Sequence, residues 1–106
     1  MYLGPAPKAP YNRNRYDRHY WFFDYGGAWQ VDWAVHHYDI VHWAMDVRGP
    51  RAAVGSGGRY FRDSNHEWPD VFAGACEYGP GPVAKKGFLM SYQARAGNQR
   101  PPDRRP

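Results

Sequence analysis

The segment 29–45 constrains the fold of this chain most, because it contains neither glycine nor proline. Its apolar residues recur every three or four positions, the spacing that gathers side chains on one face of an α-helix. Gly49 and Pro50 follow, and such a pair ends helices. We therefore predict a helix over residues 29–45 whose buried stripe consists of Val31, Val35, Tyr38, Val41 and Met45.

Three segments after this helix are predicted to be strands. Turn sequences separate them, namely Asp-Ser-Asn at positions 63–65 and Gly-Pro-Gly-Pro at positions 79–82. The predicted strands span residues 52–61, 70–78 and 83–93. One helix followed by three such strands predicts the α+β class, with one main helix packed on a small, mostly antiparallel sheet.

The two ends of the chain differ from this central part. Pro5, Pro7 and Pro10 predict irregular backbone over residues 1–18, because each proline fixes its own φ and restricts the preceding residue. Residues 97–106 are rich in proline and arginine and are expected to be disordered. A chain of 106 residues suffices for one small domain, which we assign to residues 1–96.

Composition and charge limit the function classes. The net charge is +4, the arginines concentrate near both ends, and the chain has 5 Trp, 9 Tyr and 5 Phe. Arginines interleaved with rings also occur in small nucleic-acid-binding modules, but this alternative rests on composition alone, so we do not expect nucleic acid as the partner. The single cysteine, Cys76, excludes an intramolecular disulfide and is expected to be inert core.

Targeting and membrane signals are not recognisable in this sequence. It contains no run of 18 apolar residues, and its beginning lacks the pattern of a secretory signal peptide. We therefore expect no membrane partner and a cytoplasmic location.

The predicted helix carries a candidate acid/base pair. Asp32 and His36 are four residues apart and would share one helix face. Histidine exchanges a proton near neutral pH, and a carboxylate one turn away can orient it and support its charged form. The alternative is an ordinary exposed pair on the helix surface, which the spacing alone favours.

A metal site on the same helix is a second alternative. Imidazole and carboxylate groups are metal ligands, and the helix offers several of them. The zincin pattern is absent, however, and His37 projects about 100° away from His36 around the helix. We therefore do not expect a metal, although the possible ligands are His36, His37, His42, Asp32 and Asp39.

Several short motifs follow one another along the chain. The first are Leu3-Gly4-Pro5-Ala6-Pro7, Pro10-Tyr11-Asn12, Asn14-Arg15-Tyr16 and WFFDYGG at 21–27; the later ones are DWAVHHYD at 32–39, Gly57-Gly58-Arg59-Tyr60, Trp68-Pro69-Asp70 and Glu77-Tyr78. In this order they resemble the substrate-binding domain of the Gfo/Idh/MocA family of oxidoreductases. Several motifs in the correct order are more specific than any single one.

The resemblance implies hydride transfer between a sugar or polyol carbon and NAD or NADP, with the cofactor bound by a separate Rossmann domain. The family's DxxxH pattern maps onto Asp32 and His36. His36 would take the hydroxyl proton, and Asp32 would orient it or bind the substrate. By position, the substrate-binding residues would be Asn12, Arg15, Asp24, Trp33 and His37.

The chain also departs from the family pattern. The glycine of the helix motif is Ala34 here, and neither GxGxxG nor the family's Glu-Lys-Pro motif is present. We therefore expect a partial dehydrogenase C-terminal domain that binds no cofactor alone, is inactive by itself and needs a Rossmann half as partner. An open sheet face would favour homo-oligomers. A sugar-binding domain without catalysis is the remaining alternative.

Overall fold

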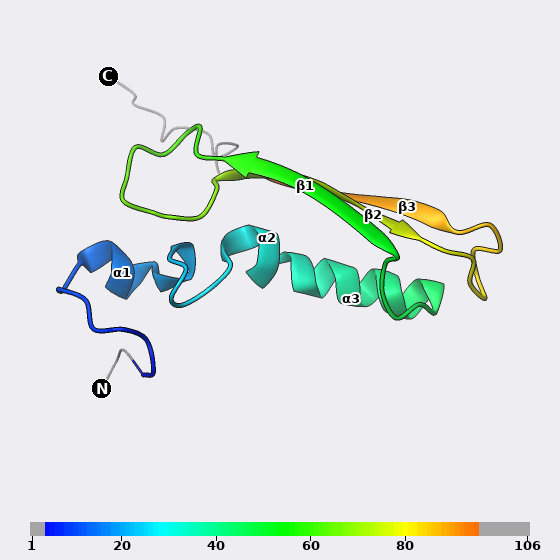
Figure 1. Ribbon diagram of the computed structural model, residues 1–106, viewed down its shortest axis with the longest axis horizontal. Helices are drawn as coiled ribbons and strands as arrows, with labels where there is room; N and C mark the ends of the chain where they lie inside the picture. Colours follow the sequence, from blue (N-terminus) through cyan, green and yellow to red (C-terminus); the bar gives the residue numbers. More distant parts are fainter. Residues whose placement is uncertain (1–3, 96–106) are drawn as a thin grey trace, which may run out of the picture.

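A computed structural model describes residues 4–95 of the chain (Figure 1). Two short helical segments precede a bent main helix, and a three-stranded sheet follows. The helical elements are α1 (Arg13–Asp17), the 3-10 helix η1 (His19–Trp21), α2 (Ala28–Asp32) and α3 (Ala34–Met45), and the strands are β1 (Ala52–Gly58), β2 (Val71–Tyr78) and β3 (Phe88–Arg95). The predicted α+β class is confirmed.

The main helix occupies the predicted segment but bends at Trp33. Trp33 keeps right-handed torsion angles, with φ −94° and ψ −38°, and its N–H donates to the Trp29 carbonyl. The next turn closes with a hydrogen bond between residues three apart, from the His36 N–H to the Trp33 carbonyl at 3.2 Å. The helix ends at Met45. Its C-cap, Asp46, has a left-handed φ of 51° and donates its N–H to the His42 and Trp43 carbonyls. Residues 28–45 thus form two helical segments, α2 and α3.

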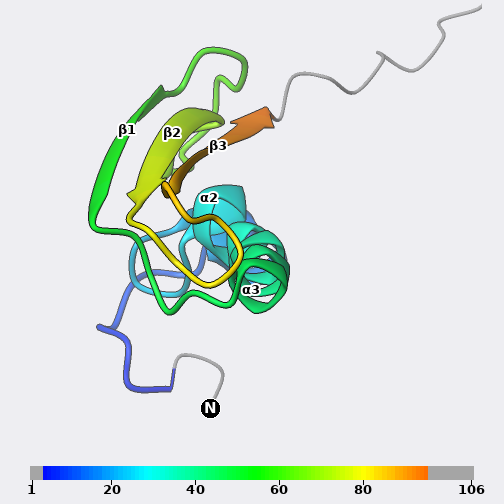
Figure 2. The same ribbon diagram turned by 90° about the vertical axis from the view of Figure 1, so that its right-hand side faces the viewer.

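The sheet has the order β1-β2-β3, and both neighbouring pairs are antiparallel. Figure 2 shows α2 and α3 on one face of it. The register sets Cys76 opposite Met90 and Tyr78 opposite Phe88. Tyr92 connects the sheet to the helix, because its hydroxyl donates to the Trp29 carbonyl at 3.2 Å and its ring contacts those of His37 and Tyr38.

The third strand begins later than residue 83, where the sequence placed its start. Residues 81–87 form turns, in which the N–H groups of Gly81 and Gly87 both donate to the Ala84 carbonyl. Gly87 adopts a φ of +82°, and a Cβ there would lie 2.3 Å from the Tyr78 carbonyl oxygen. The close approach of β2 therefore requires glycine at this position, and pairing starts at Phe88.

The predicted buried stripe is wrong in its first half. Val31 and Val35 are 52% and 54% exposed, whereas Ala34 is buried. The other predicted members, Tyr38, Val41 and Met45, are half-buried. Because of the bend and the bulky Tyr92 contacts, an apolar groove of about 400 Å³ remains between α3 and the sheet, lined by Gln30, Val31, Ala34, Val35, Tyr38, His42, Pro50, Cys76 and Tyr78. Cys76, predicted to be inert core, is a free and half-buried thiol in this groove.

The hydrophobic core of the described residues lies around η1 and the start of α2. Trp21, Phe22 and Ala28 are fully buried, with Tyr20, Tyr25, Trp29 and Trp68 packed around them. The segment after β1 returns over this cluster, and the N–H groups of Glu67 and Trp68 both donate to the Trp21 carbonyl. The radius of gyration is 17.6 Å, whereas a compact chain of this length has about 13 Å. One small aromatic core therefore supports an extended, flat molecule.

The sequence predicted irregular backbone at the start of the chain and disorder at its end. The prediction of irregular backbone over residues 1–18 is wrong for Arg13–Asp17, because Asn12 caps this helical turn. The predicted disordered tail at 97–106 lies outside the described residues. Val54 and Leu89 are 75% and 70% exposed on the sheet face away from the helices, and oligomer formation through that face stays a prediction. No helix within residues 4–95 has the length and apolarity needed to cross a membrane.

Candidate functional site

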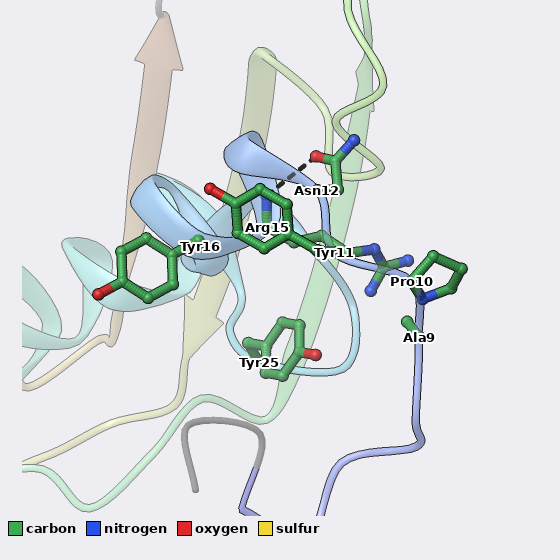
Figure 3. Close-up of a pocket in the computed structure, with 7 residues that line it drawn as sticks. All are labelled: Ala9, Pro10, Tyr11, Asn12, Arg15, Tyr16 and Tyr25. Carbon is green, nitrogen blue, oxygen red and sulfur yellow. Dashed lines mark hydrogen bonds between the residues drawn. The ribbon is translucent and has the colours of Figure 1, made fainter.

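A pocket of about 330 Å³ lies beside α1. Figure 3 shows three tyrosine rings gathered around it, those of Tyr11, Tyr16 and Tyr25. The rings of Tyr11 and Tyr16 are 6.5 Å apart and tilted by 48°. The remaining lining residues are Ala9, Pro10, Asn12 and Arg15.

Asn12 positions this wall of the pocket. It is the N-cap of α1, and its Oδ1 accepts a hydrogen bond from the Arg15 backbone N–H at 3.2 Å, drawn as a dashed line in Figure 3. Asparagine is among the best N-cap residues because this bond satisfies an otherwise unpaired N–H group. The cap leaves the amide NH2 group of Asn12 as a donor for a ligand.

Arg15 is held by two carboxylates. Its Nη1 donates to Asp24 Oδ2 at 3.3 Å, and its Nη2 donates to Glu67 Oε1 at 3.2 Å. The guanidinium also lies 4.7 Å above the Phe22 ring. The second oxygen of Glu67 accepts from the Phe23 backbone N–H at 2.7 Å. These contacts fix the Arg15 side chain, which is 24% exposed, in one orientation at the pocket.

Tyr25 supplies the polar group of the pocket that lacks a partner. Its hydroxyl oxygen is buried and has no hydrogen bond within residues 4–95. In the view of Figure 3 the hydroxyl points toward the side where Ala9 lies. An unsatisfied buried hydroxyl costs about 1–3 kcal/mol, so this oxygen is a strained feature of the pocket wall and not a group exposed to a ligand.

The structure brings three predicted site residues together and leaves four elsewhere. Asn12, Arg15 and Asp24 form one connected group, as described above. None of the four predicted residues on the main helix lines this pocket. Trp33 is 59% exposed, His36 is exposed, and the His37 ring lies 5.7 Å from that of Tyr92.

Asp32 and His36 do not form the predicted pair. The Oδ1 atom of Asp32 accepts from the Gly27 backbone N–H at 3.2 Å, before the start of α2. Within the described part of the chain no hydrogen bond or ion pair joins Asp32 to His36. The physical reason is the bend at Trp33, because the expected contact required a continuous helix from 32 to 36.

The sequence reasoning missed Glu67 and the tyrosines of the pocket. Glu67 lies 52 positions from Arg15, its partner. It belongs to an irregular segment, where no periodicity indicates which side chain turns inward. Tyr11 and Tyr16 stand within the motifs quoted above, but their spacing gave no reason to separate binding rings from core rings.

The apolar groove beside α3 has its own polar groups. His42 Nε2 and the Tyr78 hydroxyl are 2.7 Å apart. Burial, followed by the neighbouring Cys76 thiol, raises the pKa of Tyr38 to about 12. The Tyr38 hydroxyl therefore stays protonated at neutral pH and offers a hydrogen-bond donor, not a base.

The described residues do not fit a metal or a dinucleotide. Within residues 4–95 no group of three or more His, Cys, Asp or Glu side chains is placed to hold a metal ion. Gly55 and Gly57 lie on β1, where no helix N-terminus follows to receive a pyrophosphate. A Cβ at Gly57 would lie 2.7 Å from the Val71 carbonyl oxygen, so this glycine serves packing between strands.

Comparison with known proteins gave no relative: no family model matches the chain, and neither a curated protein nor a solved structure matches it significantly.

Proposed function

We propose that this chain binds a sugar or polyol in the tyrosine pocket and is the substrate-binding part of an NAD(P)-dependent oxidoreductase. The observation that carries the proposal is the assembly of Asn12, Arg15 and Asp24 beside three tyrosine rings. Two of these polar residues, Asn12 and Arg15, line a pocket whose size suits one or two sugar rings. Small-molecule sites commonly combine aromatic side chains with a few fixed polar groups.

The pocket matches the two kinds of surface that a sugar presents. The C–H faces of a sugar ring pack on aromatic rings, here those of Tyr11, Tyr16 and Tyr25. Its hydroxyl groups exchange hydrogen bonds with fixed donors and acceptors. The Asn12 amide and the Arg15 guanidinium provide these groups at the same pocket.

The redox step is not assigned to this chain alone. Nicotinamide would supply the hydride chemistry, and the described residues do not fit it. His36, which would accept the proton, is exposed on α3 and outside the pocket. Substrate binding by the isolated chain, with catalysis only beside a cofactor-binding partner, is therefore the function that these residues support best.

The rings of the pocket provide a direct test. Tyr11→Ala should weaken the binding of a sugar or polyol about fivefold to tenfold, because a stacking ring contributes about 1 kcal/mol. The measurement is calorimetric titration of the chain with glucose, myo-inositol and mannitol. Tyr11 is 80% exposed, so its removal should leave the fold intact, which circular dichroism verifies.

Trp43→Ala is the matched control, since that ring is 85% exposed and outside the pocket. It should leave the affinity unchanged, and so should His36→Ala. The proposal is wrong if none of the three compounds binds at concentrations up to tens of millimolar, on the order of the weakest specific sugar affinities. It is equally wrong if Tyr11→Ala and Trp43→Ala weaken binding to the same extent.

A further inference from the structure

A second group of arginines lies apart from the tyrosine pocket. Arg18 precedes η1, and Arg59 and Arg62 belong to the segment that follows β1. Within residues 4–95 none of these three forms an ion pair, whereas Arg13, Arg15 and Arg51 each do: the pairs are Arg13–Asp17, Arg15–Asp24, Arg15–Glu67 and Arg51–Glu77. Three positive charges are thus left without a carboxylate partner in contact.

Arg59 and Arg62 line one pocket of about 340 Å³, together with Tyr60, Phe61, Asp63 and Ser64. No residue of this pocket lines the tyrosine pocket. It is formed by the loop that connects β1 to β2 and covers the Trp21 core.

The loop is held in place by its own hydrogen bonds. The buried Asp70 carboxylate accepts from the backbone N–H groups of Tyr60, Phe61 and Arg62 at 2.8, 3.0 and 2.7 Å. Arg59 donates to the Ser64 carbonyl at 3.1 Å and also to the His66 carbonyl. The Arg62 guanidinium lies 5.3 Å above the Trp21 ring. The two loop arginines therefore project from a fixed backbone, a condition for specific recognition.

His66 lies in the positive electrostatic potential of these arginines. Its ring is 4% exposed and stacks on Trp21 with centroids 5.7 Å apart. Nδ1 lies 2.9 Å from the Ser64 hydroxyl, whereas the buried Nε2 has no partner within the described residues. Burial lowers the pKa of His66, and the charges of Arg62, Arg18 and Arg59 lower it further. All three guanidinium groups therefore act on one imidazole.

The acidic groups nearby do not cancel this charge. The loop carries three carboxylates, Asp63, Glu67 and Asp70, and Glu67 is already paired with Arg15. The charge of Asp70 is already matched by three backbone N–H donors. An anion in this pocket would meet both Arg59 and Arg62 and lie in the field of Arg18.

We propose that Arg18, Arg59 and Arg62 form a binding site for a phosphate-type oxyanion, carried by a small molecule. Guanidinium groups form charge-assisted, bidentate hydrogen bonds with phosphate oxygens. Arg59 and Arg62 line a single pocket and Arg18 lies outside its lining, an arrangement that suits one compact phosphate group. Nucleic acid would need a longer basic stripe along the surface. This site is independent of the sugar-binding proposal, because the two pockets share no residue.

The test is a calorimetric titration of the chain with inorganic phosphate, against sodium chloride of equal ionic strength. Phosphate should bind saturably, and Arg62→Gln should weaken it about tenfold, the effect of one charge-assisted hydrogen bond. Arg18→Gln removes only a nearby charge and should weaken it less. Arg62→Lys should retain part of the affinity and shows that a loss in Arg62→Gln reflects charge and not unfolding. Arg48→Gln is the matched control, an exposed arginine after α3, and should bind phosphate like the parent chain.

A second readout is the NMR titration of the His66 ring in the presence of sulfate, whose charge does not change with pH in this range. Bound sulfate should raise the pKa of His66, because it offsets the field of the three arginines. An unsaturable phosphate titration, or an equal loss of affinity in Arg48→Gln, would overturn the proposal. So would tighter binding of a single-stranded oligonucleotide with a steep salt dependence, which would assign the arginines to nucleic acid.

Discussion

Trp21→Ala should reduce the free energy of unfolding by about 3–5 kcal/mol, the cost of emptying a buried tryptophan site. Trp21 is 1% exposed and contacts the rings of Trp29 and His66 at 5.6 and 5.7 Å. Because it belongs to a core of few fully buried residues, its neighbours have little other apolar surface to collapse onto. The loss is a large part of the 5–15 kcal/mol that stabilises a typical domain.

Urea denaturation monitored by near-ultraviolet circular dichroism measures this change. Trp43→Ala removes the same side chain from an 85% exposed position and should change the free energy of unfolding by less than about 0.5 kcal/mol. Similar losses in the two variants would show that the cluster around Trp21 is not the stabilising core.

Asp70→Ala should cost about 3 kcal/mol, because it leaves three backbone N–H groups of the loop without their acceptor. Asp70→Asn keeps one acceptor oxygen, so it should cost about half as much. The measurement is the urea midpoint of both variants at pH 7. A free energy of unfolding unchanged by Asp70→Ala would mean that the loop is not built around this carboxylate.

The lowered pKa of Asp70 also leads us to expect that the free energy of unfolding depends on pH. Burial by itself raises the pKa of Asp70, but the hydrogen bonds from Tyr60, Phe61 and Arg62, with the charge of Arg62, bring it below its ordinary value of 3.8. The stabilisation is therefore complete above pH 3.8 and is lost as the pH falls through the lower, folded-state pKa. Asp70→Asn should flatten the acid side of the stability profile in that range, while His19→Gln, at an exposed position, should not.

Much of the fold could be predicted from patterns within single segments. The α+β class, the three strands and the extent of the main helix follow from local composition and turn residues. The bend at Trp33 could not be predicted in this way. Its torsion angles are right-handed and require neither glycine nor proline, so no residue in the sequence marks the bend. The exposure of Val31 and Val35 is its consequence, since periodicity assigns a face to a helix but cannot show that a sheet fails to reach it.

The candidate site was predictable only in part. Asn12, Arg15 and Asp24 were named from motif positions, and their contacts bring them together. The Asp32–His36 pair was derived from helix spacing and is not formed, because the carboxylate bonds to Gly27 instead. Glu67 completes the Arg15 contacts from a distant loop, and no local pattern encodes a pairing of that kind.

The groove between α3 and the sheet sets how the molecule opens locally. α3 meets the sheet through a few aromatic pairs, His37 and Tyr38 with Tyr92 and His42 with Tyr78, and buries little apolar surface there. Segments with few buried contacts detach at a free energy below that of global unfolding. The amide hydrogens of α3 should therefore exchange with deuterium sooner than those of β2, the central strand. We therefore expect α3, which carries His36, to rearrange more easily than the sheet when a partner binds.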